Sequence, residues 1–167
     1  MTLSLRRFAI IALAGGITIL VATCVYFVAR LNSVLSSEVM IERHGGAISK
    51  EGWDFGPRHI TFAIDGIPRT TSDNDVFEIQ RDLQNLPLLE SISFEGCPLS
   101  DQAVQAIVSL KGLKSLDLRN TNITDASLEY LERLPRLEKL DLRGTKLSSE
   151  KLTEFQKIHP HLILQQR

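Results

Sequence analysis

A 24-residue period in the apolar residues constrains the fold of this 167-residue chain more than any other feature. Its three units start at Leu86, Leu110 and Leu134, and they follow one another without an insertion. A fixed period of this length indicates a solenoid, because each unit is too small to bury its own apolar face and must stack on its neighbours. The recurring residues are Leu86, Leu89, Ile92, Phe94, Cys97, Leu99, Asp101, Val104 and Ile107 in the first unit; Leu110, Leu113, Leu116, Leu118, Thr121, Ile123, Asp125, Leu128 and Leu131 in the second; and Leu134, Leu137, Leu140, Leu142, Thr145, Leu147, Glu150, Leu152 and Phe155 in the third.

The polar residues of each unit predict a short strand, a turn and a helix. In the second unit, Asp117 between two leucines is typical of a half-buried strand. Thr121 follows at the turn, where its hydroxyl can bond the backbone. Thr124 is the expected helix N-cap, and Asp125 places a negative charge at the positive end of the helix dipole. The corresponding residues are Cys97, Ser100 and Asp101 in the first unit, and Thr145, Ser148 or Ser149, and Glu150 in the third.

Each predicted helix should bury one apolar face, and a stop signal follows two of them, Gly112 after the first and Pro135 after the second. Residues 159–167 are expected to form a C-terminal cap with one last strand at 162–164. The whole sheet should then have roughly five strands. The helix residues expected to be buried are Val104, Ile107, Leu110, Leu128, Leu131, Leu134, Leu152, Phe155 and Ile158.

A charge-free apolar stretch occupies residues 8–29, with Arg6 and Arg7 before it and Arg30 after it. About 20 apolar residues cross a bilayer as a helix, so the stretch is predicted to be a transmembrane helix. The positive-inside rule then places residues 1–7 in the cytoplasm and the rest of the chain in the periplasm or outside the cell.

Three alternatives to a membrane anchor stay open. The apolar region of a cleaved signal peptide is about 7–15 residues long, which is shorter than this stretch. Cys24 could belong to a lipoprotein signal, although apolar residues continue beyond it. A buried core helix is the third reading.

If the stretch is a membrane helix, Ala12 and Gly16 have the spacing that brings such helices together in pairs.

The segment between the anchor and the repeats divides into a stalk, residues 30–37, and a region rich in glycine and proline, residues 38–85. In the second region, alternation predicts a strand at 60–64. A helix should follow, capped by Ser72 or Asp73. We interpret this strand-loop-helix as an N-terminal cap, because the terminal units of a solenoid are atypical. The apolar residues of its helix are Val76, Ile79, Leu83 and Leu86.

The segment Leu113–Leu128 resembles the leucine-rich repeat family, in the cysteine-containing type with the pattern LxxLxLxx(T/C/N)xITDxxL. The resemblance covers residues 86–164, about half of the chain, and residues 38–85 are similar to capping regions of membrane-anchored bacterial proteins with such repeats. It implies an α/β fold, a short solenoid of three repeats over residues 86–158. A parallel sheet would line its concave face and helices its convex face, and its usual activity would be protein binding.

Residues between the buried leucines should point to solvent on the strand face. Adjacent strands lie about 4.8 Å apart, so Asp117 should lie beside Asp141 and Arg119 beside Arg143. These rows are interpreted as a zwitterionic strip for a protein partner, or else as a solvated face whose charges compensate one another. The outward residues are Ser91, Ser93, Glu95, Ser115, Asp117, Arg119, Lys139, Asp141 and Arg143.

Little in the sequence indicates catalysis, a metal or a cofactor. Gly45 and Gly46 are interpreted as a turn, because no phosphate-binding glycine pattern surrounds them. His159 and His161 have a metal-ligand spacing without a nearby third ligand. Trp53 is expected to pack in the cap. We therefore expect no catalytic residue, no cofactor and no small-molecule substrate.

Net charge and cysteine content narrow the partners further. The formal net charge is −1, whereas sequence-independent binding to nucleic acid needs a basic surface. Cys24 and Cys97 lie in such different surroundings that we expect no disulfide. The leading hypothesis is a membrane-tethered, non-enzymatic module for protein–protein interaction. The alternatives are a structural protein in which the repeats act as a spacer, and a hydrolase or metal enzyme.

Overall fold

The computed structural model describes residues 2–50, 58–61 and 71–165. It divides the chain into two units, Met1–Leu35 and Ser36–Arg167. Trp53, and the part of the predicted strand 60–64 beyond Thr61, lie outside the described residues.

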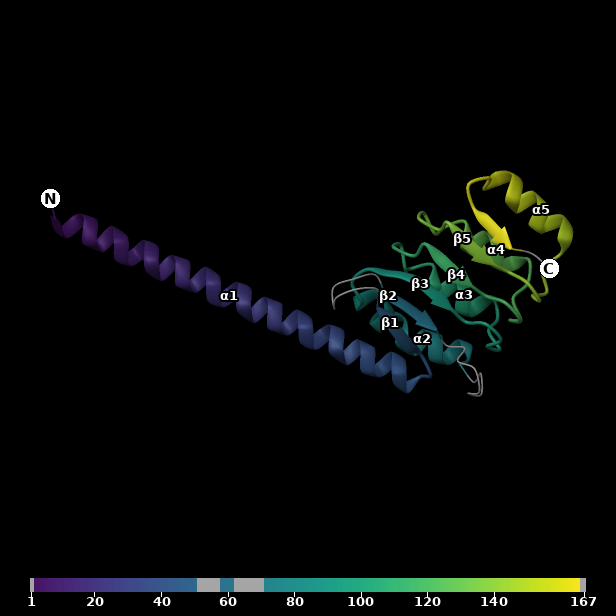
Figure 1. Ribbon diagram of the computed structural model, residues 1–167, viewed down its shortest axis with the longest axis horizontal. Helices are drawn as coiled ribbons and strands as arrows, with labels where there is room; N and C mark the ends of the chain where they lie inside the picture. The colour runs from purple at the N-terminus through teal and green to yellow at the C-terminus, as the bar shows by residue number, and fades with distance from the viewer. Residues whose placement is uncertain (1, 51–57, 62–70, 166–167) are drawn as a thin grey trace. The chain divides into compact units, whose positions relative to one another are not determined.

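Helix α1, Thr2–Arg43, supplies the first unit (Figure 1). Its last residues, from Ser36 onward, belong to the second unit. The helix predicted for residues 8–29 lies within α1, and the helix also runs through the stalk. Among the residues whose side chains are described, Ile19–Arg43 is long and apolar enough to cross a membrane. The large apolar side chains from Ile19 to Val28 are exposed, as for Ile19 (70%) and Tyr26 (73%). This exposure argues against a core helix of a folded domain.

The second unit is built on a six-stranded sheet in which strand order follows the sequence (Figure 1). β1 pairs antiparallel with β2, and every later neighbour is parallel. The sequence predicted about five strands, and β1 is the one it missed. The strands are β1 (Ala47–Lys50), β2 (Arg58–Thr61), β3 (Leu89–Ser93), β4 (Ser115–Asp117), β5 (Lys139–Asp141) and β6 (Ile163–Gln165).

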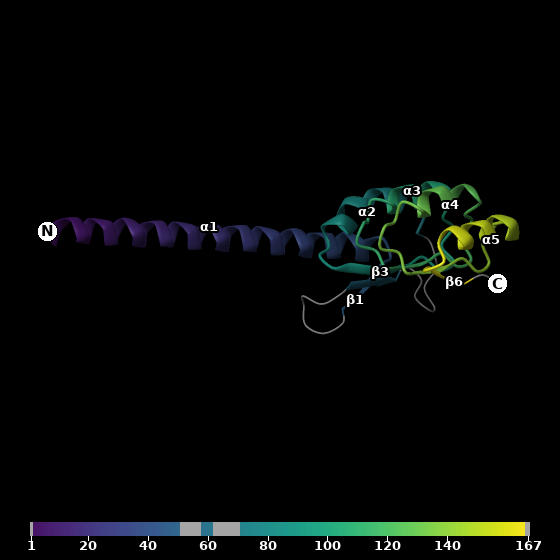
Figure 2. The same ribbon diagram turned by 90° about the horizontal axis from the view of Figure 1, so that it is seen from above.

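Helices connect the parallel strands, as an α/β repeat fold requires. Figure 2 shows α2, α3 and α4 side by side along one face of the sheet, and none of the helices that the structure describes covers the other face of β3–β6. The predicted alternation of helices with a mostly parallel sheet is confirmed. The helices are α2 (Asp73–Asn85), α3 (Asp101–Ile107), α4 (Ala126–Leu131) and α5 (Ser149–Ile158).

The recurring leucines form the core between sheet and helices. The in-phase residues Ile92, Leu116 and Leu140 are each at most 1% exposed. Burial of such a side chain contributes about 1.5–3 kcal/mol, so these positions dominate the stability of the repeats. The prediction is wrong for Ile158, which is 59% exposed. Ile158 ends α5, the last helix, so none of the described helices stacks beyond it.

Left-handed residues end the strands of the three repeats in the same way. The in-phase residues Gly96, Asn120 and Gly144 have φ of 69°, 55° and 70°. Glycine and asparagine adopt this conformation at the lowest cost, which explains the residue types. Directly afterwards, the hydroxyl of Thr121 donates to the Leu118 carbonyl (2.7 Å), as predicted for a turn threonine.

Aspartates at the starts of the helices join each unit to the next. Asp101 accepts a hydrogen bond from the backbone N–H of Thr124 (2.8 Å), and Asp125 accepts one from Ser148 (2.7 Å). Ser72, Ser100 and Ser148 are N-caps, as predicted.

Helix α4 starts one residue later than predicted, with Asp125 in the N-cap position, but the Thr124 hydroxyl oxygen still accepts the backbone N–H of Ala126 (3.4 Å), as a capping side chain does. The same hydroxyl donates its hydrogen to Asp101 of the preceding unit (2.7 Å), so Thr124 also joins two units, as Ser100 does through Asp73.

The carboxyl-terminal end of α1 packs within the second unit. Ser37 donates to the Asp82 carboxylate on α2 (2.8 Å), and the Arg58 guanidinium on β2 bonds to Glu38 (3.2 Å). Ile41, on the same part of the helix, is fully buried. The last turns of α1 are therefore part of the folded domain.

Candidate binding face on the sheet

The candidate site is the face of β3–β6 that the helices leave uncovered, which we call the strand face. Alternation along each strand buries the central leucine and turns its neighbours outward. The register aligns Ser93 with Asp117 and Asp117 with Asp141 in one row. A second row aligns Ser115 with Lys139. The structure therefore brings the predicted strand residues together in the expected order.

The arginines two residues beyond the strands neutralise these carboxylates. The Arg119 guanidinium lies 2.7 Å from Glu95, 2.8 Å from Asp117 and 3.4 Å from Asp141. Arg143 forms an ion pair with Asp141 at 2.6 Å. The predicted compensation between carboxylate and guanidinium rows is confirmed by these pairs.

The same side chains also fix the turns that follow the strands. Asp117 accepts the backbone N–H of Arg119 (3.0 Å), and Asp141 accepts that of Arg143 (3.2 Å). Ser93 donates its hydroxyl to Asp117 at 3.1 Å. The outward residues thus support the repeat backbone as well as forming its surface.

Hydrogen bonding keeps these groups ionised. Burial raises the pKa of the Asp117 carboxyl, but hydrogen bonds from the Arg119 side chain and backbone outweigh it and hold that pKa below its ordinary value. Hydrogen bonding to Asp117 raises the pKa of Arg119 in turn, and Asp141 raises the pKa of Arg143. The strand face therefore presents fixed charges of both signs near neutral pH.

A shallow hollow of about 190 Å³ lies on the strand face between β4, β5 and β6. It includes Ser115, Asp117, Lys139 and Asp141 from the predicted set, whereas the other five predicted residues are not part of its lining. Ile163 and Gln165 also line it, and they were not among the predicted residues. Their signal was available, because they stand in phase with the residues of β5. The lining residues are Ser115, Leu116, Asp117, Lys139, Leu140, Asp141, Ile163 and Gln165.

The described residues contain no group of three or more histidine, cysteine, aspartate or glutamate side chains placed to hold a metal ion. His159 and His161 lie with their ring centroids 6.0 Å apart. Cys97 is fully buried at its turn. The geometry of the strand face is thus that of a polar contact surface with one small hollow.

Comparison with known families agrees with this geometry. Residues 111–157 match a family described as Leucine Rich repeats (2 copies). The match spans the second and third units, and the register between β3 and β4 extends the same repeat to the first unit. The match and the mostly parallel sheet together support a leucine-rich repeat family.

Leucine-rich repeat domains generally mediate protein–protein interaction and are typically non-enzymatic. A search among curated proteins finds no match for this chain.

Proposed function

We propose that this chain is a membrane-tethered leucine-rich repeat module that binds a protein partner through its strand face. One observation carries the proposal: four parallel strands, β3–β6, present charged and polar side chains around a hollow on a face that the helices leave uncovered. Leucine-rich repeats supply such a face to other proteins as their general activity.

The partner should match the strand face in charge order rather than in net charge. Lys139 is exposed and has no ion pair among the described residues, whereas Asp141 is already paired with Arg143. Complementary charges at such a surface determine specificity and association rate more than affinity. Ile163, 56% exposed beside the hollow, would supply apolar contact. A face of this size suits a weak contact, near the lower end of about 1,000 Å² in total.

The tether would be the apolar part of α1 over residues 8–29. Arg6 and Arg7 precede it, which favours a cytoplasmic N-terminus and a repeat domain in the periplasm or outside the cell. Protease treatment of intact cells tests this topology. For a periplasmic domain, we expect the protease to digest the repeat domain only after the outer membrane is permeabilised. A tag on the cytoplasmic N-terminus should stay protected in the same cells.

The binding proposal is tested by in-cell crosslinking of the full chain. We expect Lys139→Glu and Ile163→Asp to reduce crosslinking to the partner several-fold, because both side chains line the hollow. Lys157→Glu on α5 is the matched control, since it reverses an equally exposed charge on a helix. Equal recovery of the crosslinked product from all four proteins would refute a role of the strand face.

A structural role is the second candidate, and the length of α1 favours it. In that case the membrane helix would carry the function and the repeats would act as a spacer. Replacement of residues 8–29 by an unrelated anchor separates the two. Function should survive the replacement if the strand face acts, and it should be lost if the helix acts.

A further inference from the structure

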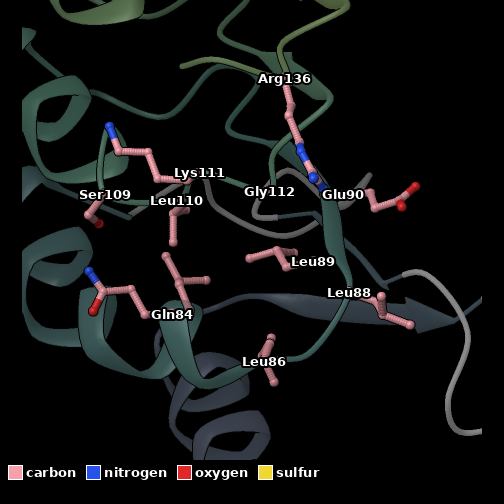
Figure 3. A pocket seen from close by; sticks show the side chains of 11 residues that line it. Gln84, Leu86, Leu88, Leu89, Glu90, Ser109, Leu110, Lys111, Gly112 and Arg136 are labelled. Carbon is pink, nitrogen blue, oxygen red and sulfur yellow. The ribbon is translucent and has the colours of Figure 1, made fainter. Parts of the chain in front are cut away.

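A second surface lies where the helices lead back into the strands. Three of these loops carry the in-phase residues Leu88, Gly112 and Arg136, which stand 24 residues apart. All three line a pocket of about 270 Å³, shown in Figure 3. We call it the loop pocket. Its apolar lining includes Leu89 and Leu110, and it shares no residue with the hollow on the strand face.

Leu88 holds an unfavourable backbone conformation at the pocket. Its φ of 57° lies in the left-handed region, which a leucine rarely adopts, and its side chain is 54% exposed. The buried Arg58 fixes this backbone, because its N–H donates to the Leu88 carbonyl and its guanidinium to the Pro87 carbonyl, both at 2.8 Å. A strained backbone thus holds an apolar side chain in contact with solvent. Backbone strain of this kind is concentrated at functional positions.

Gly112 keeps the middle of the loop pocket open. Its φ lies outside the left-handed region, and an added Cβ would meet only the Leu89 carbonyl oxygen at an ordinary distance of 3.6 Å. Neither backbone geometry nor crowding therefore requires a glycine here. The loop pocket therefore has no side chain at this in-phase position, whereas Leu88 and Arg136 carry long ones.

Arg136 brings a free positive charge to the loop pocket. None of the described residues forms a hydrogen bond or ion pair with its guanidinium. The other three arginines of the repeats bond carboxylates of this chain, as Arg133 does with Glu129 at 3.0 Å. The one carboxylate in the lining, Glu90, is paired at 2.8 Å with Lys114, which directly precedes β4.

We propose that the loop pocket binds an extended peptide segment of a partner protein in which an aspartate or glutamate stands next to an aliphatic residue. The carboxylate would pair with Arg136, whose planar guanidinium can bond both oxygens. The aliphatic side chain would cover Leu88 and fill the gap at Gly112. A volume of about 270 Å³ is below the roughly 300–1,000 Å³ of small-molecule sites and suits one or two side chains.

The test selects peptides against the full chain in lipid nanodiscs. A phage library of random peptides joined through their carboxyl ends to the coat protein removes free C-terminal carboxylates as ligands. We expect enriched peptides to place an acidic residue within two positions of an aliphatic one. A synthetic copy with blocked ends then serves as the probe in a fluorescence-polarisation titration.

The variants locate the bound peptide. Arg136→Glu, Leu88→Gly and Gly112→Leu should each weaken binding by about tenfold or more, the effect of losing one charge-assisted pair or its apolar neighbour. Arg133→Glu is the matched control, because it reverses an exposed charge three residues away that is already paired. Leu88→Gly should keep the melting temperature, since glycine accepts the left-handed conformation.

Three outcomes would overturn the loop pocket. The first is a selection that enriches no peptide over an empty nanodisc. The second is binding that falls with Lys139→Glu but not with Arg136→Glu, which would move the peptide to the strand face and favour the proposed function instead. The third is a crosslinked dimer of this chain that disappears with Arg136→Glu, which would make a second copy the occupant.

Discussion

The strand face and the loop pocket use the same residue types in opposite ways. On the strand face, Arg119 contacts three carboxylates of its own chain. At the loop pocket, Arg136 contacts none of those that the structure describes. A repeat scaffold can therefore pair an arginine with its own carboxylates or leave it unpaired for a ligand. The two cases are distinguished only by the partners of each side chain.

The difference also separates stability from recognition. A charge that is paired within the chain must break that pair before it can bind a partner, so it adds little affinity. An unpaired charge beside apolar surface can pair with a ligand without first breaking an ion pair of its own chain. The strand face should thus contribute to stability and specificity, and the loop pocket to affinity.

The largest effect should come from the core beneath the strand face. Leu140→Ala empties a site that is 1% exposed and should lower the free energy of unfolding by about 2–5 kcal/mol. Arg143→Ala, on the surface three residues later, should cost far less. Urea denaturation of both variants measures the difference, and equal losses would mean that the buried and outward faces have been exchanged.

A smaller effect should distinguish the two kinds of glycine. Gly144→Ala should cost about 1–2 kcal/mol, because φ is +70° and the new Cβ would collide with the Asn120 side chain. Gly112→Ala at the loop pocket should change stability by less than about 0.5 kcal/mol, since neither problem exists there. Similar melting temperatures for the two variants would contradict the claim that only Gly144 is required by the fold.

Acid should weaken the interactions of the strand face. The pKa of Asp117 is held below its ordinary value of about 3.9, so its contribution to stability is complete above that pH and disappears as pH falls through the lower folded-state pKa. The free energy of unfolding, measured by urea denaturation, should drop below about pH 4, by about 1 kcal/mol for this carboxylate.

Asp117→Asn should flatten that part of the profile, whereas the exposed Glu129→Gln should leave it unchanged.

The sequence predicted those parts of the fold that depend on one unit alone. The 24-residue period places Leu116 and Leu140 in the core, and local capping chemistry identifies Ser100 and Ser148. Prediction was off by one residue at the start of α4, where Asp125 and not Thr124 stands in the N-cap position. It also failed for β1, whose four residues carry no alternating pattern of their own.

The candidate sites show the same division. Alternation predicted the outward residues of the strand face, because side-chain direction in a strand is a local property. The loop pocket was not predicted, although Leu88, Gly112 and Arg136 stand in phase. The pocket offers a positive charge only because Arg136 has no ion pair among the described residues, and the structure is needed to show that.

The smallest expected effect gives the sharpest contrast between the regions. Arg136→Ala removes no hydrogen bond or ion pair with the described residues, so it should change the free energy of unfolding by less than about 0.5 kcal/mol. Arg119→Ala should cost more, about 1 kcal/mol, because it leaves Glu95, Asp117 and Asp141 without the cation between them. Salt should reduce the Arg119 effect, since screening weakens those pairs, and should leave the Arg136 effect near zero. If Arg136→Ala destabilised the protein as much as Arg119→Ala, the guanidinium would have a structural partner and the loop pocket would have no free charge to offer.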